Sequence, residues 1–336
     1  MKILFAGLTP RAFLRRYWQK RPLFVPRAFA DFTGLVDKRA LEALAARDDV
    51  ESRIVERRGT RRNTHQGPFE KATIRKRDAT LLVSGVNLHV EAAEALLRRF
   101  AFIPQARLDD VMVSYATPGG GVGPHVDSYD VFLLQGPGRR RWRFEGRSVI
   151  AGPGDILYLP PGIEHDGVAL EECYTYSIGF RAPRGAELGA AFLDWLHERG
   201  LPDAVYRDPQ LVPSTRPARV PAHMVRFSEK VLSRIRWSTR DVADFTGRYL
   251  SMPKPHVVFR RSRTRGRHVR LDAKTQLLYF GDRFFMNGES LSVRHPQLLR
   301  QLADRREAEL RALAPLAALI GEWRDAGYLH YTGNRG

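Results

Sequence analysis

The sequence predicts a mixed α+β protein with a β-barrel of the jelly-roll type, then a helical region, then a small winged-helix-like domain. Three observations lead to this prediction. Between residues 111 and 180, short strand-like runs alternate with Gly/Pro turns, which is typical of a sandwich or barrel. Candidate metal ligands lie inside this region and favour a jelly roll. Beyond it, helical patterns surround a single hairpin signature.

Helices and short strands are expected before the barrel. The first helix is predicted over residues 9–19, with Thr9 as its N-cap and Pro10 in the first helical position. Apolar periodicity predicts two further helices, at residues 37–46 and 90–100. The extended segments of this part are residues 23–25, 51–55 and 80–83.

A change in composition separates the barrel from the C-terminal part of the chain. The predicted barrel strands are residues 111–115, 131–134, 141–144, 155–159 and 173–180. A helix is expected at residues 185–199, and then residues 208–221 contain four prolines and few apolar residues, as in a linker. We therefore predict a catalytic domain at residues 1–205, a linker at 206–224 and a C-terminal part at 225–336.

The C-terminal part combines helices with a hairpin. One or two helices are predicted within residues 228–250. A strand at 275–280, a Gly-Asp turn and a strand at 283–286 form the hairpin signature. Helices at 296–312 and 316–325 complete a module that resembles a winged helix.

The chain is strongly basic, with a net charge of +18 that comes mostly from arginine. Seven Lys or Arg residues and no acidic residue occur between Lys254 and Arg270, and residues 139–143 form a second basic cluster. Such density attracts phosphate backbones, with an affinity that falls steeply in salt. A solvated surface without a fixed partner explains the same pattern, so contact with ribosomal RNA is one of two open interpretations.

Cysteine usage and hydropathy indicate the compartment. The single cysteine, Cys173, excludes an intramolecular disulfide framework and fits a reducing cytoplasm, where it would pack on a strand near the barrel core. No run of residues approaches the length needed to span a bilayer. We expect a cytoplasmic protein without a membrane partner.

Three side chains suggest a metal centre. His125 and Asp127 are two residues apart on a strand-like run, so they share one face. His165 comes after a Pro-Pro-Gly turn farther along the chain. Two histidines and one carboxylate form the facial triad of non-haem Fe(II) oxygenases, which leaves coordination positions open. Each piece alone is weak, but the glycine-rich segment 118–124 leads directly into His125 and can fold closely over a site.

Several longer motifs resemble one known family. They include YWQKRPLFV, SRIVERR, DDVMVSYATPGGGVGPHVDSYDVFLLQGPGRRRWRF, GDILYLPPGIEHDGVALE and YSIGFRAP, and more faintly LLYFGDRFFMNGES. The chain is similar to the bacterial ribosomal oxygenases, which are JmjC-type Fe(II)- and 2-oxoglutarate-dependent protein hydroxylases. The resemblance implies a double-stranded β-helix (the cupin or JmjC jelly roll), a helical dimerisation region and a winged-helix-like domain. It also implies a homodimer that hydroxylates an arginine of a large-subunit ribosomal protein.

The resemblance implies roles for the site residues. His125, Asp127 and His165 occupy the positions of the iron ligands. Arg140 occupies the position of the basic residue that holds the distal carboxylate of 2-oxoglutarate, and a guanidinium suits two-bond contact with a carboxylate. Alternation along the strand sends the neighbouring arginines to the opposite face. Ser114 is expected to add a hydroxyl to the same carboxylate, while dioxygen takes an open position on the metal.

Alternation also predicts the substrate contacts. If Ser114 faces the barrel interior, then Met112 and Asp110 lie on the same face of their strand. Asp110 would pair with a cationic side chain at the entrance, while Met112 and Tyr129 would enclose its aliphatic stem, as the resemblance implies. Core packing explains Met112 equally well, and a solvated strand end explains Asp110.

Two alternatives remain open at this point. The same iron chemistry serves a hydroxylase or demethylase that acts on another basic protein. The connection between Phe144 and Gly154 is shorter than in the family, and this favours a second alternative, a catalytically impaired ribosome- or RNA-binding protein. The cupin-type metal isomerases are disfavoured, because their sites usually offer extra histidine or glutamate ligands.

Overall fold

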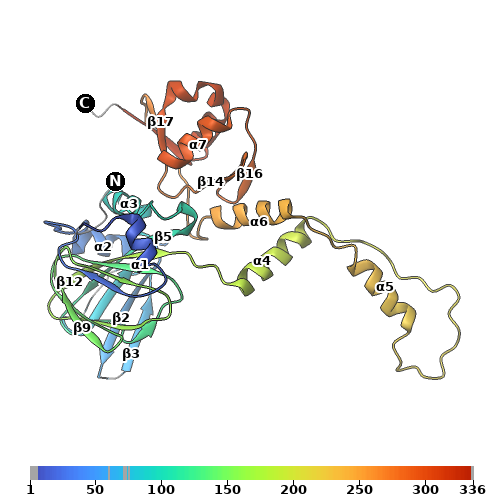
Figure 1. Cartoon of the computed structure of the whole chain (residues 1–336), viewed down its shortest axis with the longest axis horizontal. Coiled ribbons are helices and arrows are strands. Elements are labelled where there is room, and N and C mark those ends of the chain that lie inside the picture. The colour runs from blue at the N-terminus through green and yellow to red at the C-terminus, as the bar shows by residue number, and fades with distance from the viewer. Residues whose placement is uncertain (1–6, 60, 71–73, 75, 334–336) are drawn as a thin grey trace.

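The computed structural model describes residues 7–59, 61–70, 74 and 76–333. Two antiparallel sheets form the barrel at the blue-green end of the chain, and a separate C-terminal domain lies above it in Figure 1. Among the described residues no helix is long and apolar enough to cross a membrane. The predicted mixed fold with a jelly-roll barrel is confirmed.

The large sheet has eight strands in the order β1-β10-β7-β12-β5-β4-β2-β3. Its members are β1 (Leu23–Val25), β2 (Ser52–Arg58), β3 (Arg61–Gln66), β4 (Ala79–Val83), β5 (Leu108–Ala116), β7 (Val131–Gln135), β10 (Ile156–Leu159) and β12 (Cys173–Phe180). Most of these strands are rich in β-branched and aromatic residues, which suit a pleated and largely buried surface. Strand β3 is the exception, because every one of its residues is exposed.

The small sheet has the order β6-β11-β8-β9 and carries most of the metal motif. Its strands are β6 (His125–Val126), β8 (Arg140–Phe144), β9 (Arg147–Ala151) and β11 (Glu164–Ala169). A buried apolar cluster that includes Leu133, Leu157, Trp142 and Phe144 joins side chains of both sheets. Cys173 is buried and packs with Ala116 and Ala169, as predicted.

Helices cover the outer side of the large sheet. These are α1 (Pro10–Arg16), α2 (Lys38–Ala45) and α3 (Glu91–Arg98), with the short helices η1 (Val86–Leu88) and η2 (Gln105–Arg107). Thr9 caps α1 by accepting the Ala12 N–H, as the sequence predicts. Phe13, Leu41 and Leu96 enter one large core cluster with the strands. This packing fixes the sheet whose inner face carries the site.

The helical region extends away from the barrel in Figure 1. It consists of α4 (Gly185–Glu198), α5 (Ala222–Leu232) and α6 (Thr239–Ser251). The one or two helices predicted within residues 228–250 are two, α5 and α6, and α5 begins earlier than predicted. The proline-rich segment before α5 forms neither helix nor strand, although α5 begins inside the predicted linker.

The C-terminal domain has a core of its own, formed by Leu271, Phe284, Leu302 and Trp323 among others. Its elements are β13 (His268–Leu271), β14 (Leu277–Phe280), β15 (Arg283–Met286), β16 (Glu289–Leu291), α7 (Pro296–Arg305), β17 (Glu307–Glu309), η3 (Leu310–Leu316), α8 (Ala317–Asp325) and β18 (Leu329–Thr332). The prediction that α7 reaches residue 312 is wrong, because Arg306 adopts a left-handed conformation with φ 64° and ends the helix.

Charged side chains join the C-terminal domain to α3. Arg270 on β13 forms ion pairs with Glu91 at 2.6 Å and Glu94 at 3.0 Å. The buried Arg306 lies 3.5 Å from the same Glu94. Arg270, the last residue of the basic run, therefore forms ion pairs within the molecule. This weakens the interpretation of the basic run as a purely solvated face.

Candidate metal centre and active site

A single cavity of about 590 Å³ contains all of the predicted site residues. Side chains of both barrel sheets line it, together with one residue from beyond α6. The residues predicted from the sequence that line it are Asp110, Met112, Ser114, His125, Asp127, Tyr129, Arg140 and His165. The folded chain thus brings together residues that are up to 55 positions apart in the sequence.

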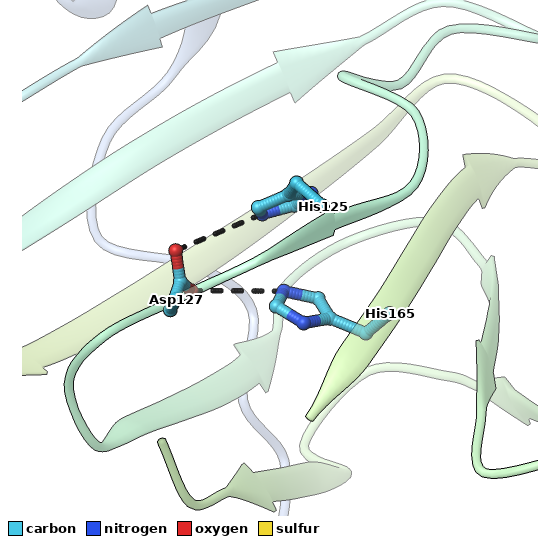
Figure 2. A group of neighbouring side chains, drawn as sticks. All are labelled: His125, Asp127 and His165. Atoms are coloured by element: carbon cyan, nitrogen blue, oxygen red, sulfur yellow. Dashed lines mark ion pairs between the residues drawn. The ribbon is translucent and has the colours of Figure 1, made fainter. Parts of the chain in front are cut away.

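Two histidines and one aspartate form a compact cluster in this cavity (Figure 2). The pairing of β6 with β11 places His125 directly opposite His165. The Nε2 atoms of His125 and His165 lie 3.9 Å and 3.7 Å from the two carboxylate oxygens of Asp127. One ligand atom from each residue lies within 4.8 Å of the others, which suits a single metal ion.

Backbone carbonyls orient both imidazole rings. Nδ1 of His125 lies 2.8 Å from the Gly123 carbonyl, and Nδ1 of His165 lies 3.0 Å from the Ile163 carbonyl. A carbonyl only accepts, so each Nδ1 carries the proton and each Nε2 keeps its lone pair for a metal. Burial lowers the pKa of His165, which keeps this ring neutral and ready to bind.

The glycine-rich loop that precedes His125 is held closely against the barrel. Gly119 and Gly123 have φ angles of 81° and 82°, which disfavour other residues. A Cβ atom at Gly121 would clash with the Gly167 carbonyl oxygen on β11. The loop therefore needs small residues where it crosses β11, the strand of His165. It ends at β6, which places His125 beside that strand.

Arg140 is a buried cation that lies over the Trp142 ring but lacks hydrogen-bond partners for part of its guanidinium. The residue is 5% exposed, and its Nε and Nη2 atoms form no hydrogen bond within the described part of the chain. Buried guanidinium groups are normally satisfied, so these atoms are available to an anionic ligand in the cavity. Arg139 behaves differently, because it is exposed and pairs with Glu171 at 3.1 Å. Of the arginines at positions 139–141, only Arg140 lines the cavity.

Strand β5 forms the opposite wall. Asp110, Met112 and Ser114 alternate along it and all face the cavity, as the period of a strand requires. Asp110 is almost completely buried and accepts the backbone N–H of Gly85 at 2.9 Å. Tyr129 lies on the loop after Asp127 and is 39% exposed at the cavity.

Three cations of this cavity are not predicted as site residues from the sequence. Lys254 pairs with Asp110, and Arg53 on β2 and Arg62 on β3 also line the wall. Lys254 belongs to the basic run, where its neighbours give no sign that one side chain turns inward. For Arg53 the available signal is its place in the SRIVERR motif, whereas Arg62 lies on a strand with no apolar alternation.

Comparison with known proteins identifies the family. A JmjC domain model matches residues 95–151 and 147–188. The chain is 35% identical over 328 residues to the ribosomal protein uL16 3-hydroxylase of Escherichia coli, with 87% of each chain covered. It is 36% identical over 208 residues to a probable ribosomal oxygenase of Haemophilus influenzae, covering 54% of this chain and 52% of that one.

A solved structure agrees with the sequence comparison. YcfD, a ribosomal oxygenase from Escherichia coli, superposes with a TM-score of 0.84 and 31% identity, covering 99% of this chain and 100% of its own. YcfD is also known in complex with cobalt and 2-oxoglutarate, and with cobalt and succinic acid.

Fold and cavity together define a protein of the JmjC class, built on a cupin-type jelly roll with a cluster of candidate metal ligands between its sheets. The agreement extends beyond the barrel to the helical region and the C-terminal domain. The chain belongs to the ribosomal oxygenase family and is a homologue of the uL16 3-hydroxylase.

Proposed function

We propose that the protein is an Fe(II)- and 2-oxoglutarate-dependent dioxygenase that hydroxylates an arginine side chain of a large-subunit ribosomal protein, the counterpart of uL16. One observation carries this proposal: Arg140, whose buried Nε and Nη2 have no hydrogen-bond partner among the described residues, lines the same cavity as the His125, Asp127 and His165 cluster. A metal centre and a buried carboxylate receptor in one cavity suit a cosubstrate that binds both.

The donor set supports iron as the metal. Two neutral imidazoles and a carboxylate are the ligands of non-haem Fe(II) oxygenases, and the three residues leave other coordination positions open. Bound there with 2-oxoglutarate and dioxygen, the iron supplies the oxidising power that hydroxylates an unactivated C–H bond. His125, Asp127 and His165 hold the metal in this proposal.

Arg140 and Ser114 act on the cosubstrate. Arg140 receives the distal carboxylate, because a guanidinium offers two parallel N–H donors to the two oxygens. Ser114, which is buried on the facing strand β5, adds a hydroxyl to the same group. The two side chains fix one end of 2-oxoglutarate while the other end faces the metal ligands.

The substrate side chain lies along β5 toward the mouth of the cavity. Asp110 provides the negative charge for a guanidinium, and Met112 and Tyr129 enclose the methylene groups between that charge and the metal. This orientation presents a carbon of the arginine stem, rather than a guanidinium nitrogen, to the metal. The relative's name, a 3-hydroxylase, supports the third carbon as the position of the new hydroxyl.

A second candidate function is demethylation or hydroxylation of another basic protein. A relative from Drosophila persimilis is named a bifunctional lysine-specific demethylase and histidyl-hydroxylase, with 23% identity over 220 residues. An acidic wall at Asp110 accepts a lysine as well as an arginine. The covered length and the higher identity of the uL16 hydroxylase favour hydroxylation of a ribosomal protein over demethylation.

The proposal extends to the compartment, the RNA contact and the oligomeric state of the enzyme. We infer a cytoplasmic enzyme that meets ribosomal proteins and contacts ribosomal RNA through the exposed arginines between residues 260 and 267. We also infer a homodimer, because α4, α5 and the segments beside them expose large apolar side chains. Among these are Leu193, Val205, Leu232 and Trp237.

Mass spectrometry of ribosomal peptides incubated with the protein, Fe(II) and 2-oxoglutarate tests the proposal. A gain of one oxygen on an arginine, absent with His125→Ala, is the expected result. Consumption of 2-oxoglutarate without any oxygen gain would mean that the substrate is another protein. Bound iron without 2-oxoglutarate consumption would overturn the enzymatic function and favour a binding protein.

A further inference from the structure

The mouth of the cavity already holds a cation of the chain itself. Lys254 is the third residue after α6, at the start of the basic run. Arg181, just after β12, donates to the Leu250 carbonyl at 2.6 Å and lies 3.5 Å from Asp109. These contacts hold the end of α6 and the next segment beside the barrel wall.

Lys254 reaches from this segment to two carboxylates. Its Nζ lies 3.1 Å from Asp110 Oδ2 and 3.3 Å from Asp109 Oδ1. The Lys254 side chain is 29% exposed, whereas the Asp110 side chain is only 12% exposed. The carboxylate that faces the cavity is therefore neutralised by the protein before any substrate arrives.

We propose that Lys254 is a placeholder for the substrate cation. In the free enzyme its ammonium group pairs with Asp109 and Asp110, and it is displaced from them when a cationic side chain enters the cavity. The inference rests on the proposed function for the identity of that side chain, but the placeholder itself is defined by the two ion pairs.

The chemistry of the pair explains why a placeholder is useful. Burial raises the pKa of Asp110, and the charge of Lys254 opposes this rise. An ionised carboxylate in such a site is costly without a partner, so Lys254 keeps it charged and dry until another cation replaces it. Two donors of a guanidinium bridge neighbouring carboxylates better than one ammonium, so arginine is well suited to the exchange.

Displacement lowers the apparent affinity of the enzyme for every cationic substrate by the same factor. That factor is the reciprocal of the fraction of molecules in which the acidic pair is free. Lys254→Met removes the competitor and is expected to lower KM for an arginine peptide roughly three- to fivefold, as suits a partly exposed pair. Lys254→Arg installs a stronger competitor and is expected to raise KM, with kcat changed little in both variants.

The kinetic comparison needs two controls. Lys38→Met removes a lysine that pairs with Glu42 on α2, outside the cavity, and is expected to leave KM unchanged. The assays are run at mildly alkaline pH, so that Asp110 stays ionised in Lys254→Met. If Lys254→Met raises KM and Lys254→Arg restores it, Lys254 is a fixed structural pair and the proposal is wrong.

Amine labelling of the full-length protein tests displacement without turnover. The probe is Nα-acetyl-arginine methylamide, with the norleucine analogue as the neutral control and the exposed Lys230 on α5 as an internal reference. We expect slow acylation of Lys254 in the free protein, faster acylation with the arginine probe and no change with norleucine. Unchanged or slower labelling with the arginine probe would overturn displacement.

The two experiments separate this inference from the proposed function. If wild-type protein hydroxylates the arginine peptide but labelling and KM do not shift, only the placeholder fails. If no peptide is hydroxylated but the arginine probe still exposes Lys254 to acylation, the proposed reaction fails and the placeholder stands.

Discussion

The Tyr158 hydroxyl donates to Asp130 Oδ1 at 2.6 Å, at the point where the loop that carries Asp127 joins β7. Asp130 is fully buried, and its other oxygen accepts from Gln19 Nε2 at 2.9 Å and from Arg107 at 3.3 Å. Asp127 and Tyr129 precede it directly in the chain. The segment after α1 and strand β10 therefore fix the loop that carries Asp127 and Tyr129 into the cavity.

Removing this anchor is expected to cost stability and activity together. Asp130→Ala leaves the buried Tyr158 hydroxyl and the Arg107 cation without their acceptor, so the free energy of unfolding falls by about 3 kcal/mol. Tyr158→Phe removes one hydrogen bond and costs about 1 kcal/mol. Urea unfolding measures both effects, and Tyr206→Phe, on a half-buried residue bonded to Asp208 far from this loop in the chain, is the matched control. Equal stability of Asp130→Ala and the wild type would contradict the anchoring role.

Arg140 is expected to control the affinity for 2-oxoglutarate. Arg140→Met removes a charge-assisted contact with the cosubstrate carboxylate, so KM for 2-oxoglutarate rises roughly 10- to 100-fold. Arg139→Met is the matched control, because Arg139 lies on the surface with Glu171. Titration of 2-oxoglutarate in a decarboxylation assay measures both variants. A similar rise in KM for 2-oxoglutarate in both variants would contradict the assignment of Arg140 as the residue that binds the cosubstrate carboxylate.

Metal binding is expected to depend on Asp127. In the wild type, Fe(II) or Co(II) at 100 times its Kd stabilises the folded state by about 2.7 kcal/mol, and Tm rises accordingly. Asp127→Ala removes the only anionic ligand of the cluster, and we expect this rise in Tm to disappear. Glu164→Ala, on the exposed start of β11, preserves the rise if the cluster is assigned correctly. Calorimetry with and without metal gives the comparison.

Acid stability is expected to depend on His89. Burial, together with the charges of Arg47 and Lys274, lowers the pKa of His89 to about 4. The unfolded chain binds a proton at the ordinary pKa near 6.5, and the folded protein does not. The free energy of unfolding therefore falls as pH falls from about 6.5 to about 4. His89→Gln flattens this part of the curve, whereas His65→Gln on the exposed β3 does not; equal slopes would contradict the assignment.

The sequence predicts which side chains meet in the cavity better than it predicts the periphery of the fold. His125 and Asp127 are two residues apart, so their shared face follows from the period of two, and the same period separates Arg140 from the neighbouring arginines on β8. The sequence places His165 after a turn without a strand of its own, whereas it lies on β11, which is only half-buried and contains a glycine. Gly167, two residues after His165 on β11, packs against the Trp142 ring, where a Cβ atom would clash. The local sequence cannot reveal this contact.

The missed elements share a physical cause. Strand β3 is exposed throughout and shows no apolar alternation, whereas β13 alternates over only four residues at the end of the basic run. The short connection after Phe144 folds into a tight hairpin with β9, turned by Glu145 and Gly146 at φ 47° and 70°. The inward turn of Lys254 depends on the placement of α6, which tertiary contacts decide.

The position of the new oxygen tests the central claim most directly. Wild-type protein is incubated with the uL16 counterpart, Fe(II) and 2-oxoglutarate, and fragment-ion mass spectrometry with NMR of the isolated residue locates the modification. We expect one hydroxyl on the third carbon of an arginine. Oxygen on a lysine or histidine, or loss of a methyl group from a methylated substrate, would contradict the proposed function.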